Sequence, residues 1–493
     1  MVGSLWLAVL LPVAFMPVVY LLGRQMGGRV AWVAALPLVY TTLSLVRLMP
    51  VVSGAPVAEY LEWLPGVRFG FYLDGLSLPI AALVAFLSVV AIIYSAEEMG
   101  CRIPEMYGGE NPRAHATYYA VMLAYAASMV GVVLSTNLFQ FYMFFELMII
   151  PSYMLINVYG SGEKEKTALS YLLWSIVGAV IFFTGVLMAY GVTGSYEITS
   201  LAQLGGTRYA GVVTALFVVG MGVKLAMLGV HFWQPAAYAE APTAVSALLS
   251  PAMSGLAAYS MARMLLPVSG ALQSVYTPAL AWGLATMVYG GLMALSENDV
   301  KRMLAYSSMS QMGYIFIGVA SANALGATGG MLHYITHAFG KAALFFCAGV
   351  IIQRTGVRDI RELGGLASKM PLTATVFLLG ALNLAGIPPT VGYPSKMMVF
   401  MGALGPGVVG GDPVQFTLGL VALVSTALTV AYTTWAMRRI FFGPLPEHLN
   451  GVRDAPALMG VAMALVAGLS LLLGVYPRPV FDLVAEAVSN LVV

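Results

Sequence analysis

Residues 329–353 have the sequence GGMLHYITHAFGKAALFFCAGVIIQ, an apolar stretch that contains a single formal charge, Lys341. A helix needs about 20 apolar residues to cross the hydrocarbon core of a bilayer, and this stretch is long enough. His333, His337 and Lys341 recur at every fourth residue, so they share one face of the helix. Ionisable groups inside a membrane are costly and usually serve a function. The stretch therefore predicts a membrane protein with a functional polar interior.

The composition of the whole chain supports a polytopic helical membrane protein. Of its 493 residues, 60% are hydrophobic and 9% are charged, whereas soluble domains carry about 25% charged residues. A formal net charge of +2 is too small to neutralise many phosphates, which argues against a nucleic-acid partner. Two cysteines, Cys101 and Cys347, are too few for a four-cysteine iron–sulfur cluster. We expect no cofactor in this chain, and we expect electron transfer to belong to another subunit.

Apolar windows of about 20 residues, separated by Gly, Pro or charge, predict fourteen transmembrane helices and an all-α fold. The windows are 4–23, 29–48, 74–95, 116–136, 138–158, 167–191, 210–230, 243–266, 274–295, 302–321, 329–353, 372–402, 414–440 and 456–475. The first lacks a basic run and a cleavage pattern, so it is expected to be a retained helix. Residues 479–493 are amphipathic and are expected to lie along the membrane interface.

The basic residues orient these helices. Loops that follow odd-numbered spans hold fifteen Lys or Arg, and the even loops with the C-terminus hold five. Basic residues concentrate on the cytoplasmic side, so both termini are expected outside the cell.

Two predicted spans carry internal breaks. The seventh, 210–230, runs through Gly220, Gly222 and Gly229 to Pro235. The twelfth, 372–402, contains the Gly386-Ile-Pro-Pro segment and Pro394. Broken helices at matching positions suggest inverted repeats with an ion site at their interface. Within one membrane domain, 1–493, we therefore expect an N-terminal part (1–115), a first repeat (116–266, helices 4–8), a second repeat (274–440, helices 9–13) and a C-terminal part (456–493).

The buried charges are spread over several spans and do not form a compact catalytic site. They are Glu146, Lys224, His231, Glu240, His333, His337, Lys341 and Lys396. Burial and neighbouring charges adjust how readily such groups hold or release a proton. A row of them linked by water predicts a proton relay through the membrane plane.

Simpler explanations stay open for each group. Glu146 and Lys224 could only tie helices together, and the histidine pair could pack or, less simply, ligate a metal, for which no third ligand lies near in sequence. Lys396 could extend to the interface. The charges of Lys301-Arg302 and of Arg358 to Glu362 are expected to be solvated in cytoplasmic loops.

Several segments resemble the antiporter-like subunits of respiratory complex I, of membrane-bound hydrogenases and of Mrp sodium/proton antiporters. The segments are Phe145-Glu146-Leu147 with Pro151-Ser152-Tyr153, Val223-Lys224, Glu240-Ala241-Pro242-Thr243-Ala244, residues 299–308, His337-Ala338-Phe339-Gly340-Lys341 and residues 359–366. The resemblance covers about residues 70–440. The sequence Asp74-Gly75-Leu76-Ser77-Leu78-Pro79 and the chain length are similar to the M-type subunit.

The resemblance implies an ion pair of Glu146 with Lys224, a central axis through His333 and His337, and an exit-side role for Lys396. This sequence departs from the M-type pattern at three positions: Lys396 replaces a glutamate, Gly255 stands where a lysine is usual, and Gln311 replaces a histidine. Either His333, His337 and Lys341 with water cover the gap at Gly255, or ion coupling differs here.

The resemblance implies an ion-translocating subunit, for protons or sodium, in the plasma membrane of a prokaryote. Its expected partners are the lipid bilayer, other membrane subunits and a peripheral redox arm. A D-type subunit of an Mrp antiporter, without a redox partner, is the alternative. A quinone-binding redox subunit is disfavoured because no residue pattern here ligates a redox centre, and a structural spacer is the remaining hypothesis.

Overall fold

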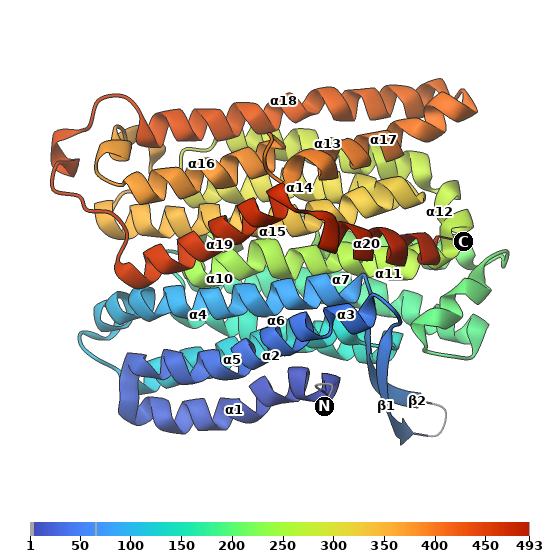
Figure 1. Ribbon diagram of the computed structural model, residues 1–493, viewed down its shortest axis with the longest axis horizontal. Helices are drawn as coiled ribbons and strands as arrows, with labels where there is room; N and C mark the ends of the chain where they lie inside the picture. Colours follow the sequence, from blue (N-terminus) through green and yellow to red (C-terminus); the bar gives the residue numbers. More distant parts are fainter. Residues whose placement is uncertain (1–3, 65–66, 493) are drawn as a thin grey trace. The chain divides into compact units, whose positions relative to one another are not determined.

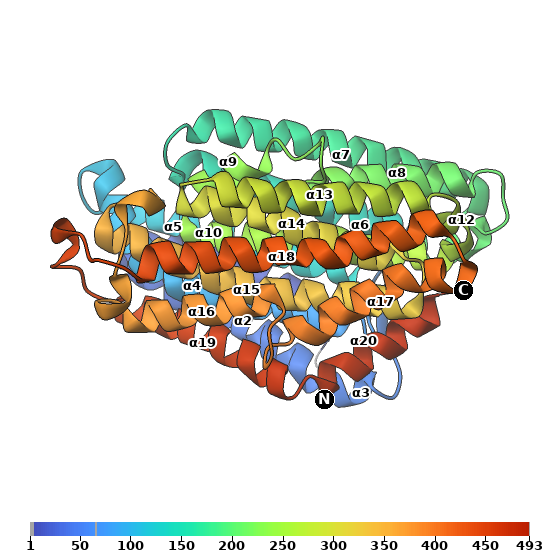
Figure 2. The ribbon, with the colours of Figure 1, turned by 90° about the horizontal axis from the view of Figure 1, so that it is seen from above.

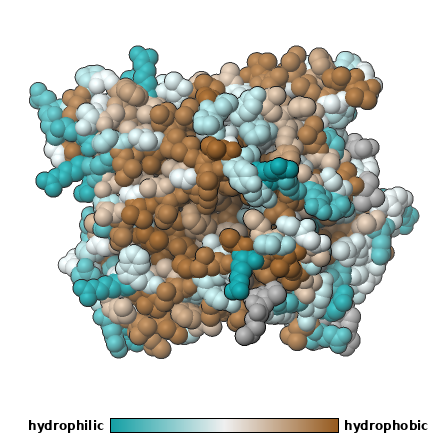
Figure 3. All heavy atoms as spheres, in the orientation of Figure 1, coloured by the Kyte–Doolittle hydropathy of each residue, from teal (hydrophilic) through white to brown (hydrophobic). Residues whose placement is uncertain are grey.

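The computed structural model describes residues 4–64 and 67–492 and is dominated by long helices (Figure 1). Much of the face in Figure 3 is covered by apolar side chains. Exposed leucines and valines such as Leu36 (60%) and Val424 (66%) lie on these helices. Water would not favour such a surface, whereas lipid does. The protein is therefore embedded in a membrane.

The chain divides into two compact units. The first comprises 1–224, 259–275 and 480–493, and the second comprises 225–258 and 276–479. The helix α11, Ser254–Leu265, contributes its first residues to the second unit and the rest to the first.

The first unit contains a bundle of helices with a short hairpin. Its elements are α1 (Leu5–Met26), η1 (Gly27–Arg29), α2 (Val30–Arg47), α3 (Met49–Val52), β1 (Val57–Leu64), β2 (Val67–Leu73), α4 (Ser77–Tyr107), α5 (Pro112–Leu134), α6 (Leu138–Tyr159), α7 (Lys164–Thr193), η2 (Ile198–Leu204), α8 (Ala210–Lys224), η4 (Leu266–Val268), α12 (Ser269–Ser274) and α20 (Arg478–Leu491). α5 packs on α1, α4 and α6, and α7 packs on α6 and α8.

The second unit is built around one long helix. Its elements are α9 (Gln234–Glu240), α10 (Thr243–Leu248), the π-helix η3 (Leu249–Met253), α13 (Tyr276–Ser296), α14 (Val300–Ala320), α15 (Ala324–Thr355), η5 (Ile360–Glu362), η6 (Leu366–Ser368), α16 (Pro371–Ala385), α17 (Gly392–Gly410), α18 (Pro413–Phe441), η7 (Glu447–Leu449) and α19 (Ala457–Val475). α15 packs against α10, α14, α16, α17 and α19, and both ribbon views show α14, α16 and α17 close to it (Figures 1 and 2). The quoted stretch 329–353 is thus the buried core of this unit.

Polar side chains mark where the helices begin. Asn137 caps α6 by accepting a hydrogen bond from the Gln140 amide at 2.7 Å, and Asp299 caps α14 through the Arg302 amide at 2.9 Å. Such caps satisfy amides that have no partner within the helix. They place the starts of α6 and α14 precisely, and therefore fix the depth of the polar residues that follow.

Both expected helix breaks are present. α8 ends at Lys224, helix resumes only at Gln234, and Ala226 takes a positive φ of 55° in between. α16 ends at Ala385, where Gly386 takes φ 75°, and α17 begins at Gly392. The left-handed Ala226 and Gly229 interrupt the first helix, and Gly386 with Pro388 and Pro389 interrupts the second. Helical hydrogen bonds cannot continue through such residues, so each lysine next to a break lies near free backbone groups.

The all-α prediction missed one hairpin. β1 and β2 pair antiparallel, with Val57 opposite Leu73 and Tyr60 opposite Gly70. Gly70 is required because a side chain there would meet the Tyr60 ring at 2.5 Å. Glu59 of β1 accepts bonds from Ser4 Oγ and the Leu5 amide at 2.7 and 3.0 Å, so the hairpin also anchors the start of α1.

Candidate ion-translocation site

Lys224 ends α8 inside the first unit and is 2% exposed. Its ammonium group donates to Tyr171 Oη and Ser175 Oγ, both at 3.2 Å and both on α7. The rings of Tyr171 and Phe145 face the same nitrogen at 4.8 and 5.6 Å. Hydroxyl acceptors and ring faces both stabilise a buried cation. Tyr171 Oη lies 2.7 Å from Ser152 Oγ, so the polar contacts continue onto α6.

Glu146 lies on α6, half-buried, with one carboxylate oxygen in the interior. Its charge and that of Lys224 act on each other. The salt bridges found within residues 4–64 and 67–492 do not include a direct contact between them. The two groups of the expected pair therefore act on each other through their charges.

A hydrogen-bonded network surrounds His333 in the second unit. One ring nitrogen, Nε2, lies 2.9 Å from Gln311 Oε1, and Nδ1 lies 3.1 Å from Ser395 Oγ. The amide nitrogen of Gln311 then donates to Tyr432 Oη at 2.8 Å and to Thr429 Oγ1 at 3.3 Å. Gln311, which departs from the family pattern, thus links α14, α15 and α18.

Lys396 lies in the first turns of α17, next to this network, and is 3% exposed. Its ammonium group sits 4.2 Å from the centre of the Tyr314 ring. Within the described part of the chain it has no hydrogen-bond partner. The Tyr314 ring also contacts His333, with ring centres 5.7 Å apart. Lys396 therefore lies inside the protein, contrary to the alternative that it extends to the membrane interface.

Lys341 and His337 continue along α15. Lys341 Nζ donates to the Leu304 carbonyl at 2.9 Å and contacts Ser307 Oγ. Both ring nitrogens of the buried His337 lack a protein partner among the residues described. A buried imidazole without partners is costly unless water supplies them. His333, His337 and Lys341 thus form the one-sided row that their spacing predicts.

Glu240 and His231 lie apart from this row. Glu240, at the end of α9, forms an ion pair with Arg358 at 3.5 Å, and Arg358 also binds Asp299 at 2.7 Å. His231 lies in the broken segment before α9, where its Nδ1 accepts from the Gly229 amide at 3.3 Å and its ring packs on Tyr289.

The expectation that Lys301 is solvated is wrong. Its side chain is 4% exposed and donates to the Ala241 carbonyl at 2.6 Å. The sequence around Lys301 does not predict this burial, because the acceptor lies 60 residues earlier, just after α9. Lys301 and Arg358 together hold the end of α9 in place.

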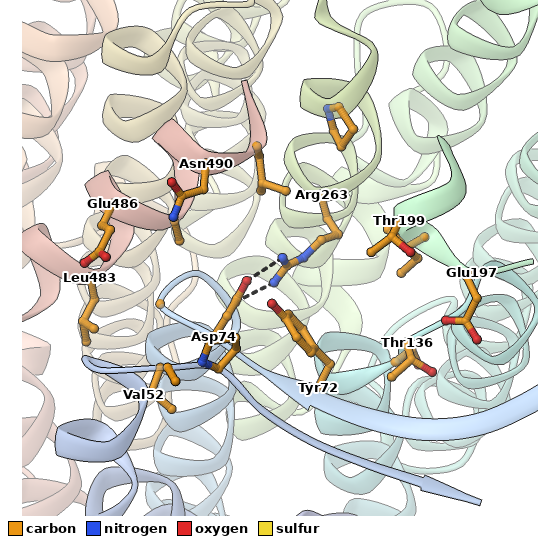
Figure 4. A pocket seen from close by; sticks show the side chains of 18 of the residues that line it. Val52, Tyr72, Asp74, Thr136, Glu197, Thr199, Arg263, Leu483, Glu486 and Asn490 are labelled. Carbon is orange, nitrogen blue, oxygen red and sulfur yellow. Dashed lines mark hydrogen bonds and ion pairs between the residues drawn. The ribbon is translucent and has the colours of Figure 1, made fainter. Parts of the chain in front are cut away.

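The sequence also gave little warning of a cavity of about 370 Å³ in the first unit. Asp74 and Arg263 meet on its wall through two hydrogen bonds of 2.7 Å, and Tyr72 lies beside them (Figure 4). Thr136, Glu197 and Asn490 line it as well. In the sequence, Arg263 is only one of the five basic residues assigned to the even loops, and Asp74 is only part of the segment Asp74-Gly75-Leu76-Ser77-Leu78-Pro79.

The geometry of both units suits proton transfer better than bond-making chemistry. Each has a buried lysine at a helix break, with hydroxyl or aromatic neighbours. A lysine amine can take up and release a proton while no bond between heavy atoms forms or breaks. Within the described ranges, no group of three or more His, Cys, Asp or Glu is placed to hold a metal ion.

Comparisons with known proteins give a consistent result. The family described as NADH:quinone oxidoreductase/Mrp antiporter, TM, matches residues 135–411. The chain is 31% identical to NADH-quinone oxidoreductase subunit M of Rhodobacter capsulatus, over 98% of this chain and 95% of that protein. It is similar to a chain of the Mrp complex from Dietzia sp. DQ12-45-1b (TM-score 0.87, 26% identity, 99% and 97% covered). It is also similar to a chain of the archaeal membrane-bound sulfane sulfur reductase (TM-score 0.85, 26% identity, 96% and 76% covered).

Proposed function

The chain belongs to the NADH:quinone oxidoreductase/Mrp antiporter transmembrane family, and we propose that it is the ion-translocating subunit of a redox-driven membrane complex. The observation that carries this proposal is the pair of buried lysines, Lys224 and Lys396, each beside a broken helix. Free backbone groups and water at such breaks stabilise a moving ion. Other membrane subunits are its partners, as in the assemblies of its relatives.

The relay that we propose uses the buried groups of both units. Glu146 and Lys224 serve the first, and His333, His337, Lys341 and Lys396 serve the second. Lys224 and Lys341 both donate to hydroxyl groups, which both donate and accept hydrogen bonds. We assign Glu240 and His231 to the entrance of this path, because His231 lies in the break between α8 and α9 and Glu240 ends the short helix that follows it.

Glu146→Gln tests the relay because it removes the charge and keeps the shape. We expect the complex to assemble and transfer electrons, while ion movement into sealed vesicles falls at least tenfold. Gln140→Glu is no control, because the Gln140 side-chain oxygen accepts a hydrogen bond from the Gly70 amide of β2 at 3.1 Å. Tyr142→Phe, one turn before Glu146 on α6, is the matched control. Normal ion movement with Glu146→Gln would mean that this carboxylate only packs.

Fourteen membrane-crossing helices remain our proposal for the topology. Among the described residues, ten segments qualify by length and hydropathy alone. That criterion joins α1 to α2, and it omits α8, α14 and the pair α16–α17. The omitted helices are either broken or rich in polar residues, as an ion path requires. Inverted repeats of helices 4–8 and 9–13, in the plasma membrane of a prokaryote with both termini outside, complete the proposal.

Cysteine labelling tests the topology. Glu165→Cys before the bulk of α7 and Arg208→Cys before α8 are both exposed positions, and the exposed native thiol is first removed with Cys101→Ser. A membrane-impermeant reagent applied to intact cells is expected to label position 208 and not 165. Labelling of both would contradict the proposed number of helices.

A subunit of an Mrp antiporter is the second candidate. The similarity to the Dietzia Mrp complex favours it, and so does Lys396, which the M-type pattern replaces by glutamate. Purifying the native complex and identifying its chains by mass spectrometry separates the two. Iron–sulfur or hydrogenase-like partners support the redox-driven complex, and small Mrp subunits alone would overturn it.

A further inference from the structure

The π-helix η3 interrupts the helical run before α11 in the second unit. Its wider turns leave groups free for other bonds, and π-helical turns often mark functional sites. The Leu249 carbonyl accepts from Tyr238 Oη at 3.1 Å, and the Ala252 carbonyl accepts from Tyr334 Oη at 3.0 Å. Between them, Ser250 Oγ lies 2.8 Å from Ser308 Oγ of α14.

Gly255, two residues beyond η3, has no room for a side chain. A β-carbon there would lie 1.9 Å from Cε2 of Tyr334, whose ring is fully buried. The family pattern carries a lysine at this position. The Tyr334 ring therefore occupies the space into which that lysine would extend, and the charge is missing from this place.

Ser308 leads from η3 to another lysine. Its hydroxyl donates to the Leu304 carbonyl at 2.8 Å, and Lys341 Nζ donates to the same oxygen at 2.9 Å. Two groups bound to one oxygen lie within reach of a single bridging water. Ser250, Ser308 and Lys341 are each completely buried, so this row is shielded from bulk solvent.

We propose that the Ser250–Ser308 hydroxyl bridge carries protons to Lys341 and so replaces the lysine absent at position 255. This rests on the proposed relay function. A protonated water gives one proton to the Ser250 oxygen, and Ser250 gives its own hydroxyl proton to Ser308. Ser308 gives its own proton, through one bridging water, to the neutral amine of Lys341, so that a neutral water remains at one end and an ammonium group forms at the other. No charge is created or lost, and both hydroxyls then turn back. Tyr334 acts as a positioning residue, because its ring fills the space beside Gly255 that the lysine of the family pattern would occupy.

Ser308→Ala breaks the bridge, and Ser308→Thr keeps a hydroxyl. We expect Ser308→Ala to lower ion movement per electron in vesicles about tenfold and Ser308→Thr to retain most of it. Ser321→Ala is the matched control: this serine follows α14, is buried, and donates to the Gly318 carbonyl at 2.7 Å, outside the row and outside the His333 network. Should Ser308→Ala fail to assemble, Ser250→Ala tests the same bridge from its other end.

A rescue experiment separates a relay role from a packing role. Tyr334→Gly opens the space and Gly255→Lys restores the charge. Added to Ser308→Ala, this pair is expected to return ion movement to within about threefold of the native value. Mere packing loss at Ser308 would not be repaired by a lysine elsewhere, so failure of the rescue in an assembled complex overturns the proposal.

Lys396→Met, measured in parallel, distinguishes a failure of the hydroxyl bridge from a failure of the relay function. If Lys396→Met blocks ion movement while Ser308→Ala and Ser250→Ala leave it intact, the hydroxyl bridge is wrong and the relay function stands. If Lys396→Met also moves ions normally, the relay function itself fails.

Discussion

Lys224 and Lys396 each lie next to a helix break, Lys224 at the end of α8 and Lys396 in the first turns of α17, yet their surroundings differ. Lys224 has two hydroxyl acceptors at 3.2 Å and an acid whose charge it senses. Lys396 faces the Tyr314 ring at 4.2 Å, and its nitrogen has no hydrogen bond in the portion of the chain that is described. Hydrogen bonds and an opposite charge stabilise an ammonium group, and a ring face does so more weakly.

This difference predicts different responses to substitution. An ammonium group at Lys224 has hydroxyl acceptors in place, whereas one at Lys396 has the Tyr314 ring as its neighbour and no hydrogen-bond acceptor among the described residues.

The largest expected effect comes from Lys396. Lys396→Met removes the proton carrier, and Lys396→Arg keeps a positive charge that cannot be released in a protein. Both are expected to abolish net ion movement in vesicles while the complex assembles. A lysine that only anchors the helix would tolerate arginine, so normal transport in Lys396→Arg would refute the role assigned here.

The aromatic ring beside Lys396 is expected to matter more than the phenol beside Lys224. Tyr314→Leu removes a contact worth up to about 2 kcal/mol when desolvated, and should slow ion movement about tenfold. Tyr171→Phe keeps the ring and leaves Ser175 as an acceptor, so a change of only about threefold is expected. Rates of ion movement are measured in matched vesicles. A larger loss with Tyr171→Phe than with Tyr314→Leu would contradict the expected difference between the two lysines.

Glu146 and Lys224 are expected to behave as one unit. Once either is neutralised, the other is a buried charge without its opposite, so most of the damage is already done. The double variant Glu146→Gln with Lys224→Ala should therefore pump no more than about threefold worse than the worse single variant. Losses that simply multiply would show that the two groups act independently.

Asp74 gives the smallest expected effect on transport and tests stability instead. Burial alone would raise the pKa of Asp74, but the Arg263 guanidinium overcomes this and holds the pKa at about 2. The stabilisation is complete above the unfolded-state pKa of about 3.9 and is lost as the pH falls through about 2. Between pH 5 and 8 this pair should contribute no pH dependence to thermal unfolding in detergent.

Asp74→Asn leaves Arg263 buried without an opposite charge, which is expected to cost about 3 kcal/mol. Glu486→Gln, on the exposed side of the same cavity, is the matched control and should leave the melting temperature unchanged. Equal stability of Asp74→Asn and the native protein would contradict the structural role of the pair.

The sequence predicted the long helices and both breaks because apolar length, glycine and proline act locally. The row of His333, His337 and Lys341 followed from helical spacing alone. Helical spacing could not reveal the hydrogen-bond partners of these groups, since Gln311 and Ser395 contact His333 from two other helices. The filling of the Gly255 position by Tyr334 likewise needs three-dimensional packing.

Two further features were not predicted from the sequence, for different reasons. The hairpin has a sequence signal, alternating residues on both sides of Pro65-Gly66, but windows of about 20 apolar residues do not detect it. The burial of Lys301 has none, because a lysine in the first turn of a helix is normally solvated, and only the distant Ala241 carbonyl reverses that.

The most direct test of the account is the number of ions moved per electron by the purified complex in sealed vesicles. It is compared between the native chain and a chain carrying both Lys224→Met and Lys396→Met. The account predicts that electron transfer continues and that the ratio falls by the share that this subunit contributes. An unchanged ratio, in a complex shown to contain the altered chain, would contradict it.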